Sequence, residues 1–160
     1  MANWYGSARS NYVRIADMGG LKRALKPFPG IEIVAEWPGP EVTGDTTGGK
    51  HALLVGEGSE DGGWPSFGLM EVEDEEGSVY EEEVEFSFIE FVMPYVEVGE
   101  VLVIMACGAE KLRYLTGFAE AYQRLADGTI RDCTVSIDDI YAKAAEAFGV
   151  GKEAISAARY

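Results

Sequence analysis

The stretch from Val101 to Tyr122, VLVIMACGAEKLRYLTGFAEAY, constrains the fold more than any other part of the chain. Val101–Cys107 is an unbroken apolar run of strand length, rich in β-branched residues, which predicts a central strand covered on both faces. Gly108 and Ala109 favour a tight reversal, and Leu112–Tyr122 has the partial alternation of a second strand. We therefore expect an antiparallel hairpin in the middle of a sheet.

Shorter patterns on either side of this hairpin predict the rest of the sheet. They share apolar or alternating residues bounded by Gly, Pro or Asp. The expected strands are Asn11–Ala16, Ile31–Trp37, Ala52–Val55 and Trp64–Val72 before the hairpin and Ile130–Val135 after it. An Asp127-Gly128 turn signal joins the last strand to the hairpin as a meander.

Two helices are expected before the central hairpin. Asp17 is a suitable N-cap for a helix over Gly19–Lys26, whose apolar residues recur at i, i+3, i+4 spacing. A second apolar stripe runs from Phe88 to about Tyr95, and Pro94 should kink or shorten that helix.

A third helix is expected near the C-terminus. Ser136 and Asp139 resemble a capping box for a helix over Asp138–Phe148. Its apolar residues, expected to face the core, are Ile140, Ala144, Ala147 and Phe148. Lys152–Tyr160 then forms either further helical turns or a frayed tail. Together these patterns predict one α+β domain over residues 1–160, with an antiparallel-dominated, partly ferredoxin-like sheet and two or three helices on one face.

Length and composition narrow the class of protein. At 160 residues the chain suits one domain with a core of its own. It contains no run of about 18 apolar residues, so we expect no membrane contact. The N-terminus lacks the pattern of a secretion signal, so the expected location is cytoplasmic. Cys107 and Cys133 lack metal-type spacing and are expected to be buried, reduced thiols.

The net charge of −15 is the strongest compositional signal, and it is unevenly distributed. Residues 52–110 hold 16 Asp or Glu and no Lys, Arg or His. The two flanks together hold 13 basic and 12 acidic residues, so the net charge belongs to the middle of the chain. Such a surface repels nucleic acid and attracts basic partners.

The densest acidic run lies between Glu71 and Glu85. Apolar residues interrupt it too often for a disordered tail, so we expect it on an exposed hairpin or helix entry. The predicted partner-binding residues are its carboxylates: Glu71, Glu73, Asp74, Glu75, Glu76, Glu81, Glu82, Glu83 and Glu85. Carboxylates spaced by several ångströms on one face would imitate a phosphate backbone, which is the physical basis of a DNA mimic. The alternative is a solvated surface that serves solubility.

Other candidate sites are weaker. Gly44–Lys50, GDTTGGK, matches a phosphate-binding loop up to the lysine, but His51 stands where a Ser or Thr should hold magnesium, and a strand is expected to follow. We interpret this stretch as a Gly-rich connector and His51, the only histidine, as an exposed loop residue. Glu71–Ser78 lacks the register of a calcium loop. We therefore expect no cofactor and no dedicated metal site.

Two further groups of residues admit both a functional and a structural interpretation. The charged turn formed by Glu110, Lys111, Arg113 and Tyr114 could be a small site or ordinary turn charges. The polar and aromatic N-terminus, from Asn3 to Tyr12, could recognise a partner or could pack as a first strand.

Three stretches resemble small, uncharacterised acidic proteins carried by phages and plasmids. They are NWYGSARSNYVRIAD, GAEKLRYLTGFAEA and DGTIRDCTVSIDDIY, and the likeness extends weakly over most of the chain. The resemblance implies a mobile-element setting, in which compact acidic proteins often resemble inhibitors of host defence such as anti-CRISPR or anti-restriction proteins. It assigns no catalytic residues.

These observations favour a non-catalytic inhibitor whose acidic face occupies a basic, nucleic-acid-binding surface of a host defence complex. Such a protein would bind another protein and not nucleic acid itself, with capture sped by electrostatic steering. One alternative is a small enzyme or nucleotide-binding protein that uses the Gly44–His51 loop and the Glu110–Tyr114 turn. Another is a structural or assembly protein of a virion, which should self-associate.

Overall fold

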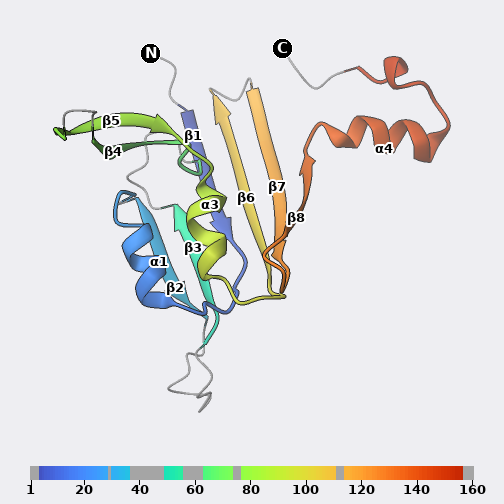
Figure 1. Cartoon of the computed structure of the whole chain (residues 1–160). Helices are drawn as coiled ribbons and strands as arrows, with labels where there is room; N and C mark the ends of the chain where they lie inside the picture. The colour runs from blue at the N-terminus through green and yellow to red at the C-terminus, as the bar shows by residue number, and fades with distance from the viewer. Residues whose placement is uncertain are drawn as a thin grey trace.

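A computed structural model describes residues 4–28, 30–36, 49–55, 63–73, 77–110 and 114–156 (Figure 1). Its main sheet has six antiparallel strands in the order β2-β3-β1-β6-β7-β8. These are β1 (Trp4–Ser10), β2 (Ile31–Ala35), β3 (His51–Val55), β6 (Val101–Glu110), β7 (Tyr114–Arg124) and β8 (Ile130–Ser136). A separate two-stranded sheet pairs β4 (Phe67–Glu73) with β5 (Val79–Glu85).

The helices are short. They are α1 (Met18–Ala24), α3 (Phe88–Val92), which continues into the 3₁₀ helix η1 (Met93–Tyr95), α4 (Asp139–Phe148) and the 3₁₀ helix η2 (Lys152–Ala154). Asp17 caps α1 as expected, because its Oδ1 accepts a hydrogen bond of 2.8 Å from the Gly20 amide. Pro94 lies at the start of η1, where the α-helical pattern ends.

The chain order explains the sheet. β1, α1, β2, β3, α3 and β6 form a β-α-β-β-α-β unit whose four strands lie in the order β2-β3-β1-β6, which is the ferredoxin-like arrangement. β7 and β8 extend this unit on the β6 side, and the β4–β5 hairpin is inserted between β3 and α3. The predicted α+β fold with an antiparallel, partly ferredoxin-like sheet is confirmed.

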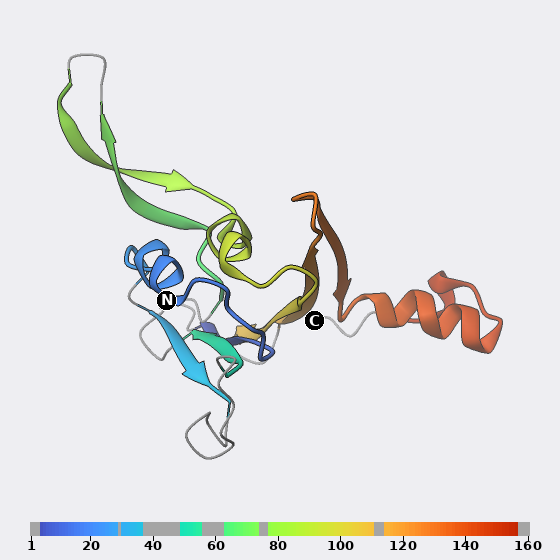
Figure 2. The same ribbon diagram turned by 60° about the horizontal axis from the view of Figure 1, so that its bottom comes forward.

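The core lies between one face of the sheet and the α1 and α3 helices (Figure 2). Leu21 on α1, Val92 on α3 and Leu102 on β6 are fully buried there. Burying side chains of this size stabilises the fold by about 1.5–3 kcal/mol each. The expected inward faces of the first two helices are therefore confirmed.

The opposite face of the sheet is open at β6. Val101 and Met105 are each 44% exposed, and Cys107 is also exposed, whereas Leu102 and Ile104 on the other face are buried. The prediction that this strand is covered on both faces is wrong. The expected burial of Cys107 and Cys133 is wrong for the same reason, although both are free thiols.

The central hairpin is confirmed, but its turn lies further along than expected. Gly108 and Ala109 do not reverse the chain, because they pair with Thr116 and Leu115 and the strand runs on to Glu110. Residues 111–113 lie outside the described part. Glu110 and Tyr114, which could belong to a small site or to an ordinary charged turn, pair at the ends of the two strands, whereas Lys111 and Arg113 lie outside the described residues.

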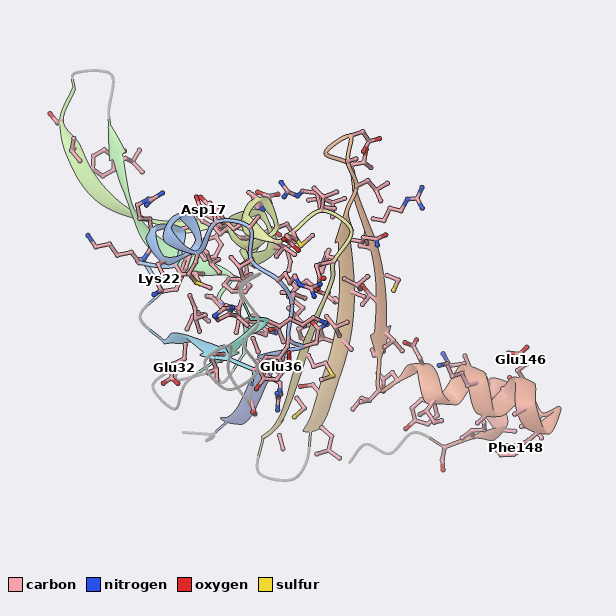
Figure 3. The ribbon with its side chains drawn as sticks, turned by 90° about the horizontal axis from the view of Figure 1, so that it is seen from below. Asp17, Lys22, Glu32, Glu36, Glu146 and Phe148 are labelled. Atoms are coloured by element: carbon pink, nitrogen blue, oxygen red, sulfur yellow. The ribbon has the colours of Figure 1, made fainter. Side chains whose placement is uncertain are left out.

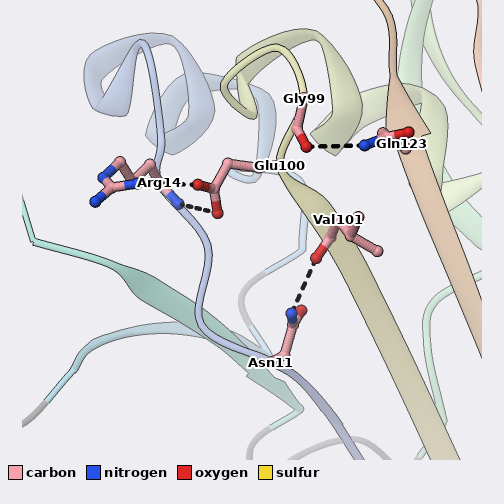
Figure 4. Close-up of polar contacts among 6 residues, drawn as sticks. All are labelled: Asn11, Arg14, Gly99, Glu100, Val101 and Gln123. Atoms are coloured by element: carbon pink, nitrogen blue, oxygen red, sulfur yellow. Dashed lines mark hydrogen bonds and ion pairs between the residues drawn. The ribbon is translucent and has the colours of Figure 1, made fainter.

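The first strand is Trp4–Ser10 and not Asn11–Ala16. The alternation after Ser10 belongs to two isolated bridges, Val13 with His51 and Ile15 with Val96. Directly after β1, the side chain of Asn11 makes the hydrogen bonds to β6 that backbone groups make within the strand pair. Its Nδ2 donates to the Val101 carbonyl at 2.9 Å (Figure 4). Its Oδ1 accepts from the Val103 amide at 2.8 Å.

The C-terminal helix differs most from expectation. The helix itself and its glycine stop are correct, since Gly149 has a φ of 66° at the C-cap. However, no residue of α4 is buried, and Ile140 and Phe148 are 60% and 77% exposed. The expectation that its apolar side faces the core is wrong, because α4 leaves the sheet beyond β8 (Figure 1). Within the described residues, no helix has the length and apolar character that crossing a bilayer requires.

Candidate functional site: an acidic hairpin

The acidic run folds as the β4–β5 hairpin, one of the two forms expected for it. Phe67 to Glu73 pairs in antiparallel register with Glu85 to Val79. The hairpin reaches away from the main sheet on the side of α1 and α3, as the long two-stranded ribbon in Figure 2 shows. The acidic residues therefore lie on an arm and not on the body of the domain.

The register sorts the acidic residues by face. Because side chains alternate along a strand, positions of equal parity in each paired set share a face. One face receives Glu71, Glu73, Glu81, Glu83 and Glu85, together with Phe67, Leu69 and Val79. The other face receives Met70, Val72, Tyr80 and Val84, with Glu82 as its only carboxylate among the paired residues.

Glu71 and Glu81 stand directly opposite each other in this register. Like charges at opposed positions of an antiparallel pair are destabilising, by roughly the 0.2–1 kcal/mol that favourable pairs contribute. No basic residue lies between His51 and Lys111 in the sequence to offset them locally. A positively charged partner would therefore reduce the repulsion between carboxylates on the acidic face of the hairpin.

Aromatic rings fix the base of the hairpin to the core. Trp64 stacks on Phe88 with ring centroids 5.0 Å apart, and Phe86 lies 4.8 Å from Phe28 and 5.1 Å from Phe91. The Phe86 amide donates to the Ser66 carbonyl at 2.9 Å, so the ladder continues one step below the paired strands. The base of the hairpin is therefore well packed against the core.

Near its far end the hairpin exposes apolar side chains. Val79 is 62% exposed and Tyr80 is 47% exposed, and they begin β5 immediately after Gly77 and Ser78. A Gly77 φ of 81° suits glycine at this position. By the register, Val79 shares the acidic face, whereas Tyr80 lies on the other face. An exposed tyrosine combines an apolar ring with a polar hydroxyl, and tyrosine is enriched at protein interfaces.

The nine predicted site residues are placed unequally. Glu85 is exposed on β5, and the register positions of Glu71, Glu73, Glu81, Glu82 and Glu83 follow from the pairing. Asp74, Glu75 and Glu76 lie outside the described residues. The pairing separates Glu82 from the other five, and the residues that sequence reasoning did not include are Val79 and Tyr80.

The alternative phosphate-binding loop is mostly outside the described residues, which resume at Gly49. The expectation that His51 is an exposed loop residue is wrong. His51 is the first residue of β3, is half-buried, and its backbone pairs with Val13. Its Nδ1 is buried and has no hydrogen-bond partner among the described residues. A strand and not a helix follows Lys50, as the sequence predicts and as a phosphate-binding loop would not allow.

No group of three or more His, Cys, Asp or Glu side chains that could hold a metal ion occurs among the described residues. Known proteins offer no guide to the site either. Neither the protein-family models, nor the curated proteins, nor the solved structures contain a match to this chain. The register, charge and exposure of the hairpin are therefore the observations that bear on the function of the chain.

Proposed function

We propose that this chain is a non-catalytic binding protein whose acidic hairpin occupies the basic, nucleic-acid-binding surface of another protein. The setting that we propose is inhibition of a host defence complex by a protein from a mobile element. The binding mode is supported by the hairpin, whereas the defence setting is supported by the sequence resemblance alone.

The observation that carries the proposal is the single acidic face of β4–β5. Five glutamates share that face over six residue steps, which is about 20 Å of extended strand. The charged levels follow one another every two residues, about 7 Å, which is close to two phosphate steps of about 3.4 Å along each strand of a DNA duplex, and Glu71 and Glu81 share one level. A protein surface shaped for one nucleic-acid strand meets a similar line of charge on this hairpin.

Repulsion within the hairpin favours the same conclusion. The opposed pair Glu71 and Glu81 weakens the isolated hairpin, and lysine or arginine side chains of a partner would convert that repulsion into attraction. A surface that serves only solubility needs neither the sorting of charges onto one face nor their presentation on an arm.

Charge alone gives fast but unselective association, so a specific inhibitor also needs apolar contacts. The exposed Val79 is placed to supply such a contact, because it shares the acidic face at the end of the hairpin, whereas Tyr80 lies on the other face. We therefore assign steering to the glutamates and a share of the selectivity to Val79.

The test is affinity capture from a host lysate at low and at high salt, followed by mass spectrometry. The bait proteins are the wild type, the variant E71Q/E81Q/E83Q and the control E32Q/E36Q/E90Q. The control removes the same charge from exposed positions on β2, at its end and on α3. We expect nucleic-acid-binding proteins to be recovered at low salt, and their recovery to fall about tenfold with the hairpin variant and little with the control.

Two results would contradict the proposal. One is equal recovery by the hairpin variant and the control, which would mean that the acidic face is not the contact surface. The other is failure to recover any nucleic-acid-binding protein with the wild type. Thermal shifts against nucleotides and divalent ions would then decide whether the chain is a small-molecule-binding protein instead.

A further inference from the structure

Among the described residues, the C-terminal helix α4 buries none of its side chains, including those of its apolar stripe. α4 carries Ile140 and Phe148 on the side of its apolar stripe, and both are mostly exposed. Among the described elements, α4 packs to a notable extent only on η2, which follows it directly. Figure 3 shows α4 running out past β8 on the side of the sheet away from α1 and α3, with Glu146 and Phe148 labelled on it.

The same molecule has an unfilled apolar groove. It lies on the open face of the sheet, has a volume of about 440 Å³, and is lined by residues that include Arg9, Met105, Cys107, Ala119, Val135 and Ile137. Gly117 forms part of its wall, and the Ile137 Cγ2 lies 3.0 Å from the position that a Cβ on Gly117 would take. Ile137, two residues before α4 begins, therefore packs against Gly117 in the lining of the groove.

The edge of the sheet next to this groove is also free. β8 is the last strand in the sheet order, and all seven of its residues are exposed. Val135 and Ile130 on it are 42% and 41% exposed. An exposed, partly apolar edge strand is a template for pairing with another strand.

We propose that these three features are one interface with a second copy of this chain. A two-fold axis beside the C-terminal end of β8 pairs the two β8 edges and lays α4 of each copy over the groove of the other. Such an interface is isologous, because each copy gives a helix and receives one. The helix does not cover its own groove, because it starts two residues after Ile137, which lines the groove, and runs out past β8 (Figure 3).

The exposed area is large enough for an interface with a second copy. The chain exposes 11097 Å², whereas a compact monomer of its 17.4 kDa mass exposes about 7,900 Å². A stable interface needs roughly 800 Å² from each partner, about a quarter of that difference. The exposed apolar residues of α4, β8 and the groove are the part of this surface from which the interface would form.

Charge is compatible with the same pairing despite the net charge of −15. Among the described residues that line the groove, Arg9 is the only charged one, and it is basic. The helix flanks its apolar stripe with Glu146, which is exposed. The acidic hairpin lies on the other side of the sheet from α4 (Figure 2). In the proposed dimer the acidic hairpins of the two copies therefore stay apart.

Sedimentation equilibrium of the full chain over a range of concentrations tests this inference with two matched pairs of variants. F148D places a charge on the apolar side of α4, and A142D places the same charge at an exposed position elsewhere on that helix. M105K places a charge in the groove opposite Arg9, which cannot pair with it. V101K places the same charge on the same face of the same strand at equal exposure but outside the groove lining.

We expect a dimer for the wild type, A142D and V101K. F148D and M105K should each raise the dimer dissociation constant by at least about 30-fold, because each buries an unpaired charge. A mixture of F148D and M105K should recover part of the association, since the intact helix of one fits the intact groove of the other. A wild type that stays monomeric at all concentrations, or a dimer that F148D leaves intact, overturns the proposal.

Thiol labelling gives an independent readout. Cys107 is exposed in a single chain but lines the groove. Its labelling rate, resolved from that of Cys133 by mass spectrometry of peptides, should rise on dilution of the wild type and should be fast at all concentrations in F148D. A Cys107 rate that does not depend on concentration in a dimeric wild type would place the groove outside the interface and contradict the proposed pairing.

Discussion

Glu71 and Glu81 occupy opposed positions of the β4–β5 ladder, with no oppositely charged residue within the hairpin sequence. Natural sheets place opposite charges or apolar pairs at such positions, because opposed like charges weaken the ladder. The hairpin is therefore less stable alone than a hairpin of the same length with neutral pairs. The acidic composition of the chain therefore lowers the stability of this hairpin.

Glu81→Lys should stabilise the hairpin, because it turns the opposed pair with Glu71 into an attractive one. We expect the gain to be about 0.2–1 kcal/mol, which slows amide hydrogen exchange in β4 and β5 by about 1.4- to 5-fold. Glu82→Lys is the control, because Glu82 stands opposite Met70 on the other face. Equal slowing by both variants would show that net charge, and not the opposed pair, governs the hairpin.

Asn11→Ala should destabilise the junction between β1 and β6. The substitution removes the side-chain bonds to the Val101 carbonyl and the Val103 amide, which leaves two backbone groups without protein partners. The expected loss in the free energy of unfolding is about 1–3 kcal/mol, measured by urea denaturation. Asn11→Asp should retain part of it, because it keeps the acceptor for the Val103 amide. An unfolding free energy for Asn11→Ala equal to that of the wild type would contradict this role.

The one-sided core predicts unequal effects from two neighbours on β6. Leu102→Ala should cost about 2–5 kcal/mol, because Leu102 is fully buried under the helices. Val101→Ala should cost much less in the monomer, because the Val101 side chain is 44% exposed on the open face. Urea denaturation of both variants in the F148D background excludes any contribution from self-association. Similar losses for the two would mean that the second face is covered as well.

Tyr122 predicts a pH dependence at the alkaline end. Burial raises the pKa of its hydroxyl, and so does the 2.7 Å hydrogen bond that it donates to Glu120. Because the folded-state pKa lies above the unfolded value of about 10, the contribution of Tyr122 to stability is complete below pH 10 and is lost as the pH rises beyond it.

Tyr122→Phe should therefore lower the stability by about 1 kcal/mol at neutral pH and lose less stability than the wild type above pH 10. Unfolding curves at neutral and alkaline pH measure both effects. All other tyrosines are common to the two proteins, so the comparison isolates Tyr122. Parallel losses in the two proteins above pH 10 would show that the Tyr122 pKa is not raised.

The sequence predicts most of the fold because local patterns and packing agree over much of the chain. The Asp17 cap, the Asp127-Gly128 turn and the central strand pair are examples. The predicted turn at Gly108 is wrong, because Gly108 lies within β6 and pairs with Thr116. A glycine within a strand cannot be told from a turn glycine by sequence alone.

The C-terminal helix shows a different limit. An apolar stripe predicts that a helix buries one side, but it does not say against which surface. Ile140 and Phe148 have the correct spacing, yet both are mostly exposed and no described element covers them. The exposed Cys107 and Met105 have the same cause, because an apolar strand implies cover on both faces only when the chain supplies it.

The candidate site was predictable as a region and not as a surface. Charge counting locates the acidic run, and interruptions such as Val72 and Val84 indicate that it is folded. Which glutamates share a face depends on the register, and a shift by one residue would exchange the two faces. That is why Glu82 belonged to the predicted set but stands apart from Glu81 and Glu83 in the ladder.

The most direct test of the proposed function is competition for a nucleic-acid-binding protein recovered with the chain. Binding of that protein to labelled DNA is measured while the chain is added at low salt. We predict mutually exclusive binding, with the chain displacing the DNA and E71Q/E81Q/E83Q displacing it at about tenfold higher concentration. A stable ternary complex of the chain, the partner and DNA would contradict the account, because the hairpin and the DNA would then occupy different surfaces.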